Sequence, residues 1–316
     1  MVYTRSINDP IVASKLTGRF GGTNVAYIGA RDNTSPLLLP FEERSDLIEV
    51  GKSFTNIVRV MHNFKDNSYV GALLTDRRLD QGGGGSTVSV DASLRFLTNY
   101  RLNAQYATSL TQESNDPASI EDFDGATFDN GRYTSALDGE SFSGHGLYAE
   151  FARDSRNWFF EFEYAQLRPT FRADNGFIRQ NNVRDFSVIN GFAFYPEGIG
   201  FIDRISPRAA AGRTWNFDGV QKEDWIFTGL QMNLKGQTNV FMSYELGREQ
   251  FEGINFDELR DVGIWLNSSF SESVSLFGFI SKGKRIARNV DTPEIGDGLS
   301  YEVGGTLRPT QRLRLR

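Results

Sequence analysis

The chain has 316 residues, 23% of them charged and 39% hydrophobic, with a formal net charge of −6. It contains no run of about 18 apolar residues, which excludes helical membrane spans, and its acidic balance argues against nucleic acid, which attracts Lys and Arg. Without cysteine it forms no disulfide or thiolate metal site. The 26 Phe, 11 Tyr and 32 Gly are typical of many strands joined by turns.

Residues 86–109 form the clearest pattern, a predicted β-hairpin with two different faces. Val88, Val90 and Leu94 alternate with Ser89 and Asp91, and the alternation resumes after a short turn at 98–99. Period two is the signature of a strand. Each arm has about ten residues, the length that a tilted strand needs to cross a bilayer.

The same alternation recurs along the chain, and we predict sixteen strands, joined in turn by short and long connections. The short ones are expected near 19–23, 65–67, 98–99, 154–157, 196–200, 236–238, 271–273 and 309–311. The long ones are expected at 31–52, 77–86, 111–141, 169–183, 218–223, 250–258 and 286–298. Segregated loop lengths are typical of outer-membrane barrels, with short periplasmic turns and long extracellular loops. The predicted fold class is therefore all-β, an antiparallel up-and-down transmembrane β-barrel.

The direction in which the first and last strands cross the membrane indicates how much of a barrel the sequence contains. With short turns in the periplasm, the first strand runs inward and the last stops in mid-strand near Arg316. Complete bacterial barrels have both termini in the periplasm and an even strand count. We expect residues 1–316 to be a single barrel domain that is an internal piece of a longer protein, with further strands in the intact barrel.

Charged residues recur on the polar side of the predicted strands and are expected to line a lumen. Mixed charges of this kind set the solute preference of a pore. The predicted lumen-lining residues are Lys15, Arg59, Asp91, Arg95, Arg101, Glu161, Glu163, Glu245, Asp261, Glu302 and Arg308.

Aromatic residues gather near the short turns, where an interfacial girdle of a membrane barrel lies. The predicted girdle consists of Tyr69, Phe96, Tyr100, Trp158, Tyr195 and Phe270. The alternative is that aromatic residues simply favour strands.

The long segment 111–141 contains an acidic run with Gly turns. Because Ca²⁺ takes carboxylate oxygens, Asp122, Asp124 and Asp129 are candidate ligands, although their spacing does not match an EF-hand loop. The alternative is an ordinary solvated loop, and no other cofactor is expected. A segment of this length is also able to fold inward and constrict a lumen.

Two arrangements invite an enzymatic interpretation. Ser143 and His145 stand two apart on one strand, about 7 Å by strand rise, which is too far for a direct nucleophile–base hydrogen bond. Glu161 and Glu163 have the same spacing and no evident cleft between them. We therefore expect no enzymatic activity.

Five stretches in roughly the first hundred residues carry strand and turn signatures of a known type, namely Tyr3–Ile7, Ala13–Arg19, Asn56–Val60, Ser68–Arg77 and Val90–Phe96. They resemble a bacterial family of outer-membrane β-barrel domains of unknown function. In that family the barrel typically follows a secretory signal and a module resembling carbohydrate-binding module family nine. The resemblance implies an outer-membrane location and a link to glycan handling, and it supplies no catalytic residues.

These observations lead to one expected function and two alternatives. We expect a porin- or transporter-like barrel in the bacterial outer membrane, in contact with its lipid and lipopolysaccharide, that passes or binds small polar solutes such as oligosaccharides. The second hypothesis is a soluble or surface-attached all-β module that binds a glycan through its long loops. The third is a barrel lipid hydrolase using Ser143 and His145.

Overall fold

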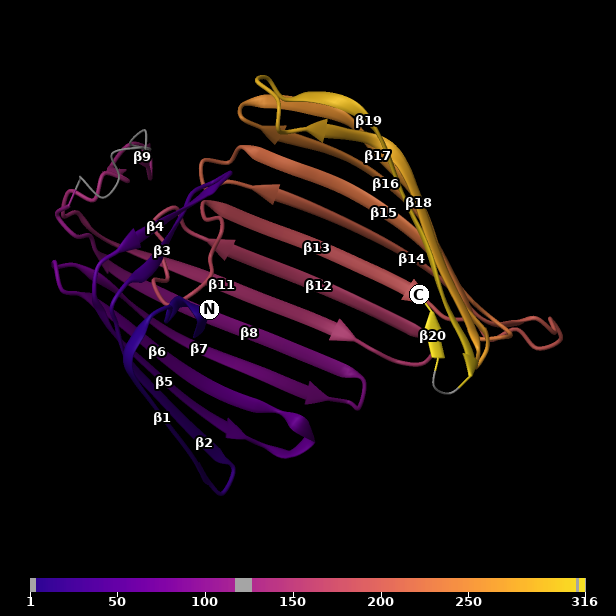
Figure 1. Ribbon diagram of the computed structural model, residues 1–316, viewed down its shortest axis with the longest axis horizontal. Coiled ribbons are helices and arrows are strands. Elements are labelled where there is room, and N and C mark those ends of the chain that lie inside the picture. The colour runs from indigo at the N-terminus through magenta and orange to yellow at the C-terminus, as the bar shows by residue number, and fades with distance from the viewer. Residues whose placement is uncertain (1–3, 117–126, 311–312, 316) are drawn as a thin grey trace. The chain divides into compact units, whose positions relative to one another are not determined.

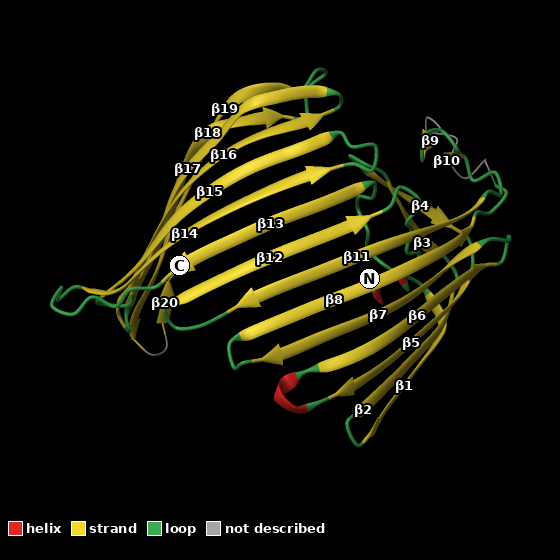
Figure 2. Ribbon diagram, turned by 180° about the vertical axis from the view of Figure 1, so that it is seen from behind, coloured by secondary structure: helices red, strands yellow, loops and turns green. Residues whose placement is uncertain are grey.

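The computed structural model describes residues 4–116, 127–310 and 313–315 of the chain (Figure 1). Strands dominate these residues, and the two helices, η1 (Thr4–Ser6) and η2 (Lys65–Asn67), are single 3₁₀ turns (Figure 2). Among the described residues, no helix has both the length and the apolar character that a membrane span requires.

Sixteen strands belong to one antiparallel sheet in which each strand pairs with the next large strand along the chain. Its members, in order, are β1 (Pro10–Phe20), β2 (Thr23–Asp32), β5 (Ser53–Asn63), β6 (Tyr69–Leu79), β7 (Gly84–Phe96), β8 (Tyr100–Gln112), β11 (Ser141–Arg153), β12 (Trp158–Leu167), β13 (Val183–Phe192), β14 (Ile202–Trp215), β15 (Gln221–Leu234), β16 (Thr238–Phe251), β17 (Ile254–Ser271), β18 (Val274–Ala287), β19 (Glu294–Thr310) and β20 (Leu313–Leu315). Two small hairpins stand outside it, β3 (Ser35–Pro40) with β4 (Ser45–Val50), and β9 (Thr127–Phe128) with β10 (Tyr133–Thr134). The predicted all-β, antiparallel up-and-down fold with sixteen strands is confirmed.

The chain divides into two compact units, described separately below. The first unit comprises Met1–Phe151, Glu163–Asp185 and Trp215–Val220. The second unit comprises Ala152–Phe162, Phe186–Thr214 and Gln221–Arg316.

In the first unit the strands bury their polar side chains and expose their apolar ones. On β7, Thr87 is 2% and Ser89 1% exposed, whereas Val88 is 51% and Val90 55% exposed. The register extends each row across the sheet, since Thr87 faces Thr75 and Ser109 on the neighbouring strands. We call the side that carries Thr87 the polar face and the side that carries Val88 the apolar face.

The second unit has the same two faces. Val262, Ile264 and Leu266 of β17 are exposed on the apolar face, and Val303 on β19 is 83% exposed. Asp261 and Gly263 alternate with them and belong to the polar face. Among the described residues of this unit, the apolar rows do not meet one another in a shared interior, as they would in a soluble sandwich.

The apolar cores of the first unit lie on the polar face, where long connections fold back onto the sheet. One core joins the β3–β4 hairpin to Leu137, with Leu79 of β6 packed against it. The other joins Ala107 of β8 to Phe171 and Ala173 of the β12–β13 connection. These segments cover part of the sheet, which explains why its serine and threonine side chains are buried.

The predicted alternation of loop length holds for only part of the chain. The long connections expected at 31–52, 111–141 and 169–183 are confirmed. The prediction is wrong elsewhere, because the strands continue into polar stretches and leave only residues 80–83, 216–220, 252–253 and 288–293 between them. At 80–83 the turn depends on glycine, since Gly82 and Gly83 have φ of 94° and 85°.

Candidate solute-binding site

The structure places all eleven predicted lumen-lining residues on the polar face of the strand that carries each one. For four of them the register gives the residue directly opposite on the neighbouring strand. Lys15 stands opposite Ile28, Glu245 stands opposite Asp261, and Glu302 stands opposite Phe279. The remaining residues follow by strand alternation, namely Arg59, Asp91, Arg95, Arg101, Glu161, Glu163 and Arg308.

Charged side chains form cross-strand networks on the polar face of the first unit. Arg59 binds both carboxylate oxygens of Asp91, with Nη2 2.7 Å from Oδ2. Arg101 donates to Oε1 of Glu150 at 2.6 and 2.9 Å. The Tyr148 hydroxyl lies 3.0 Å from Glu150 Oε2 and 3.2 Å from Glu163 Oε2. Glu150 and Tyr148 were not predicted, although both stand at polar-face positions of β11.

Arg77 connects the sheet to the segments above it. The residue is fully buried, and its guanidinium donates to the carbonyl oxygens of Pro36 at 2.9 Å and Ser6 at 2.7 Å. Its Nε donates to Thr55 Oγ1 at 3.3 Å. One β6 side chain therefore holds the β3–β4 hairpin and the η1 turn against the polar face.

The β12–β13 connection lies directly against the polar face of β8 and β11. Phe171 is fully buried, and the backbone N–H of Arg172 donates to Ser109 Oγ at 3.2 Å. A Cβ at Gly144 would lie 2.4 Å from the backbone of Phe171, so only glycine permits this approach. The inward-folded segments thus occupy the polar face of the first unit.

The polar face of the second unit instead carries a row of four aromatic rings, one on each of β15 to β18. Ring centroids lie 6.3 Å apart for Phe227 and Phe241, 5.4 Å for Phe241 and Trp265, and 6.0 Å for Trp265 and Phe279. The Arg208 guanidinium lies over the Phe241 ring, 4.4 Å from its centroid. We call these four residues the aromatic row.

Glycines beside the rings let the row lie along the sheet. A Cβ at Gly263 would come within 2.2 Å of the Trp265 ring, and one at Gly229 would contact the rings of Phe227 and Phe241 at 2.9–3.1 Å. Because both glycines have hydrogen in place of a side chain, the rings extend over the neighbouring backbone rather than standing away from it.

Charged side chains flank the aromatic row and share with three of its rings, Phe227, Phe241 and Trp265, a groove of about 540 Å³. Asp261 accepts from Arg285 Nε at 2.9 Å and from Ser281 Oγ at 3.0 Å. Glu245 stands directly opposite Asp261, and Arg288 binds Glu249 at 2.6 and 2.7 Å. Apolar rings beside carboxylate and guanidinium groups suit a ligand that combines apolar surfaces with hydroxyl groups.

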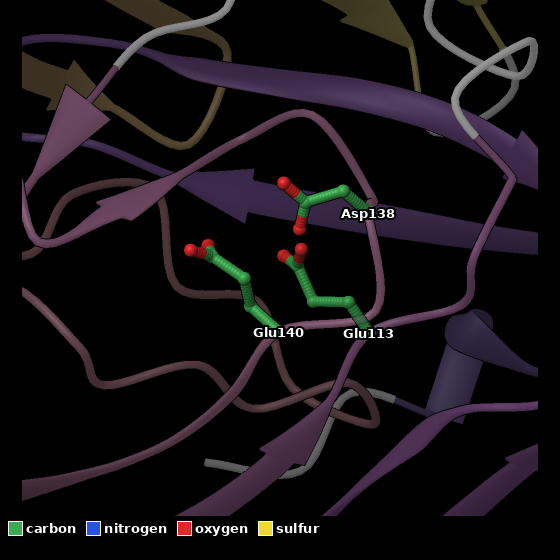
Figure 3. A group of neighbouring side chains, drawn as sticks. All are labelled: Glu113, Asp138 and Glu140. Atoms are coloured by element: carbon green, nitrogen blue, oxygen red, sulfur yellow. The ribbon is translucent and has the colours of Figure 1, made fainter.

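A second group of carboxylates lies in the first unit, where segment 113–140 leaves and rejoins the sheet. Glu113, Asp138 and Glu140 each place one oxygen within 4.8 Å of the others (Figure 3). Burial, followed by the charges of Glu140 and Asp138, raises the pKa of Glu113 to about 7, against the opposing effect of Arg172. Of the predicted ligands, Asp129 does not belong to this group, and Asp122 and Asp124 lie outside the described residues.

The predicted aromatic girdle is placed only in part. Phe96 and Tyr100 stack at 5.8 Å beside their short turn, and both contact Phe151, which was not predicted. Tyr69 stands opposite Asn63 and Ser93 on the polar face, and its place in the girdle stays a prediction. Trp158 is exposed beside the short connection at 154–157, and Tyr195 is exposed within the longer connection 193–201, each with an arginine over its ring. The side chain of Phe270 lies outside the described residues.

Ser143 and His145 share the apolar face of β11, as alternation predicts. Within the described part of the chain no hydrogen bond joins them, and His145 Nε2 instead accepts from Arg168 Nε at 3.0 Å. Ser143 thus lacks the hydrogen bond to His145 that would activate it as a nucleophile.

Comparison with known proteins adds a structural likeness. No protein-family model and no curated protein matches the chain. Among solved structures, the crystal structure of BamA from Haemophilus ducreyi lacking POTRA domains 1-3 is similar, with a TM-score of 0.41 and 9% sequence identity over 93% of this chain and 69% of that chain.

Proposed function

We propose that this chain is part of a β-barrel of the bacterial outer membrane, whose polar face lines a lumen that binds or passes oligosaccharides. The proposed role is binding and passage without catalysis. One observation carries the membrane part of the proposal: alternate residues of the same strand bury Ser and Thr and expose Val, Ile and Leu. This is the reverse of a water-soluble sheet, and it is stable where the outer face meets hydrocarbon.

Adjacent residues of β19 allow a direct test of the membrane face. The chain has no cysteine, so Val303→Cys and Glu302→Cys each offer one site for an environment-sensitive fluorophore. Both side chains are exposed, but Val303 belongs to the apolar face and Glu302 to the polar face.

In phosphatidylcholine vesicles, spin-labelled acyl chains are expected to quench the label at 303 and spare the label at 302. Equal lipid quenching at both positions contradicts the assignment of faces. A chain that stays monodisperse without detergent, with both labels open to aqueous iodide, favours the glycan-binding soluble module instead.

The solute part of the proposal rests on the aromatic row and its flanking charges. Sugar rings present apolar C–H surfaces that aromatic faces cover, while their hydroxyl groups hydrogen-bond to carboxylate and guanidinium groups. The row crosses four adjacent strands, which provides successive contacts for an extended chain of sugars. The family resemblance implies a link to glycan handling, and that link remains a prediction.

Substitutions on β16 test this part, because the strand has an aromatic residue on each face. Phe241→Ala removes a ring from the aromatic row, whereas Tyr244→Ala removes one from the apolar face. An aromatic contact is worth about 0.5–1.5 kcal/mol, so Phe241→Ala is expected to raise the Kd for maltohexaose or a comparable neutral oligosaccharide by about 2- to 13-fold. Tryptophan fluorescence gives the readout, and equal Kd values for the two variants contradict the proposal.

Outer-membrane lipid is the proposed partner of the apolar face. Three basic residues of β17 and β18 cluster there, since Arg260 faces Lys284 and Val262 faces Lys282. Arg260 and Lys282 are exposed, and directly opposed like charges such as Arg260 and Lys284 are unfavourable without an anion. Glu258 binds Lys284 at 2.8 Å and offsets part of this charge. The cluster suits the phosphate groups of lipopolysaccharide.

A further inference from the structure

The acidic group of the first unit stands where a long segment is joined to the sheet. Glu113 directly follows β8, and Glu140 directly precedes β11. The Glu113 N–H donates to the Glu140 carbonyl oxygen at 2.8 Å, and a backbone bridge pairs Asn115 with Asp138. Whatever binds these carboxylates therefore fixes both ends of the segment to each other.

The spacing of the three carboxylates matches a shared calcium ion. Oxygen ligands of Ca²⁺ lie at about 2.3–2.6 Å, so two of them are separated by at most about 4.6–5.2 Å. One oxygen from each of Glu113, Asp138 and Glu140 lies within 4.8 Å of the other two. Separations up to this limit are therefore within the reach of one calcium ion.

Glu113 supplies an independent indication of a ligand. Its side chain is 2% exposed, and within the described part of the chain its Oε2 has no hydrogen-bond partner. Figure 3 shows this carboxyl group extending toward those of Asp138 and Glu140. A buried carboxylate oxygen without a partner is costly, and two further carboxylates beside it add repulsion.

Among the described residues, the contacts of this group include one cation, Arg172, whose charge is divided between two carboxylates. Arg172 donates to Glu113 Oε1 at 3.2 Å, but it also binds Asp174 at 2.9 Å. Glu140 Oε2 accepts the Thr134 N–H at 2.8 Å, which is a neutral donor. Glu113 thus shares one guanidinium with Asp174, and the carboxylates of Asp138 and Glu140 stand beside its unpartnered oxygen.

We propose that Glu113, Asp138 and Glu140 bind a calcium ion that clamps the two ends of segment 113–140 over the polar face. Glu113 supplies its buried Oε2, and the two residues from the returning end of the segment complete the carboxylate set. The clamp holds Leu137 in the apolar core that it forms with the β3–β4 hairpin.

Calcium binding to the purified chain in detergent micelles tests this site. Isothermal titration with CaCl₂ at pH 7.5, after chelation, is expected to show one ion per chain. Glu113→Gln keeps the side-chain shape and Asp138→Asn alters an exposed residue, and each is expected to weaken calcium binding at least tenfold. Asp129→Asn, in the same segment and outside the acidic group, is the matched control and leaves the affinity unchanged.

Proteolysis supplies a second readout that does not depend on heat of binding. Calcium is expected to slow trypsin cleavage after exposed Arg132 in the wild type and in Asp129→Asn, but not in Asp138→Asn. If the chain binds no calcium at millimolar concentration, the proposal is overturned, and it follows that a shared proton holds the carboxylates together. Binding that Glu113→Gln and Asp138→Asn leave intact overturns it as well.

Discussion

Replacing Gly144 by alanine tests whether the β12–β13 connection lies on the polar face of the first unit. The added Cβ would stand 2.4 Å from the N and Cα atoms of Phe171, and 2.5 Å from the carbonyl carbon of Thr170. These are backbone atoms and ordinary contacts start at 3.4 Å, so the connection has to move by about 1 Å.

The expected magnitude follows from the cost of overpacking. Extra methyl groups in a close-packed site cost about 1–3 kcal/mol. Arg172 and Ala173 are buried, so trypsin cleaves between them only after the connection opens. Where opening is fast relative to cleavage, the rate follows the open population, and Gly144→Ala is expected to raise it about 5- to 160-fold.

Limited trypsin digestion in detergent, followed by mass spectrometry, measures this rate. Exposed Arg179 in the same connection is cleaved without opening and serves as the internal reference. Gly296→Ala is the control, because its Cβ meets nothing within 4 Å. A folded Gly144→Ala protein with the wild-type rate at Arg172 would refute the packing of this connection against β11.

Two further substitutions test the buried guanidinium and the basic cluster. Arg77→Met removes the donor to the buried Ser6 carbonyl and to the partly buried Pro36 carbonyl, so it is expected to cost about 3–5 kcal/mol and lower the unfolding temperature. Arg78→Met instead breaks an exposed ion pair worth less than about 1 kcal/mol. Equal shifts in thermal unfolding would contradict the role of Arg77. Each cation near an anionic lipid surface is worth about 1 kcal/mol, so the Arg260→Gln/Lys282→Gln double variant is expected to bind fluorescent lipopolysaccharide about 30-fold more weakly, and an unchanged Kd would exclude the cluster as its site.

The faces of the strands were predictable because alternation is a local property. Val88, Ser89, Val90 and Asp91 need no knowledge of the rest of the chain to be assigned to opposite sides. This reasoning places each charged residue on the polar face, but it does not identify its partner. The ion pair of Arg59 with Asp91 spans 32 positions and depends on the register of three strands.

Strand lengths were harder to predict, because a strand that extends beyond an apolar band has the composition of a loop. Residues 250–258 mix three apolar residues with Gln250, Glu252, Asn255, Asp257 and Glu258, yet β16 and β17 continue through them to a turn at Glu252 and Gly253. Both residues have positive φ, 49° and 75°, which matches the tight turn that closes a two-residue hairpin. A residue followed by glycine between two strands was the signal that composition concealed.

The inward-folded connections and the aromatic row also had a local signal, in the glycines of strand interiors. Gly144 admits the backbone of Phe171, and Gly263 admits the ring of Trp265. An interior glycine indicates close approach of something to the strand. It does not indicate what approaches, because a chain segment and a side chain both need the same space.

The two units use the polar face in different ways, and this difference bears on solute binding. In the first unit, the β3–β4 hairpin held by Arg77 and the segment around Phe171 lie against the polar face, so a solute would have to displace protein contacts to reach it. In the second unit, the groove along Trp265 and Asp261 is lined by side chains whose apolar surfaces and polar atoms are both accessible. A ligand that replaces water there covers apolar rings while the flanking charges keep hydrogen-bonding partners. The proposed solute contacts therefore cost least in the second unit, whereas the first unit holds the connections in place.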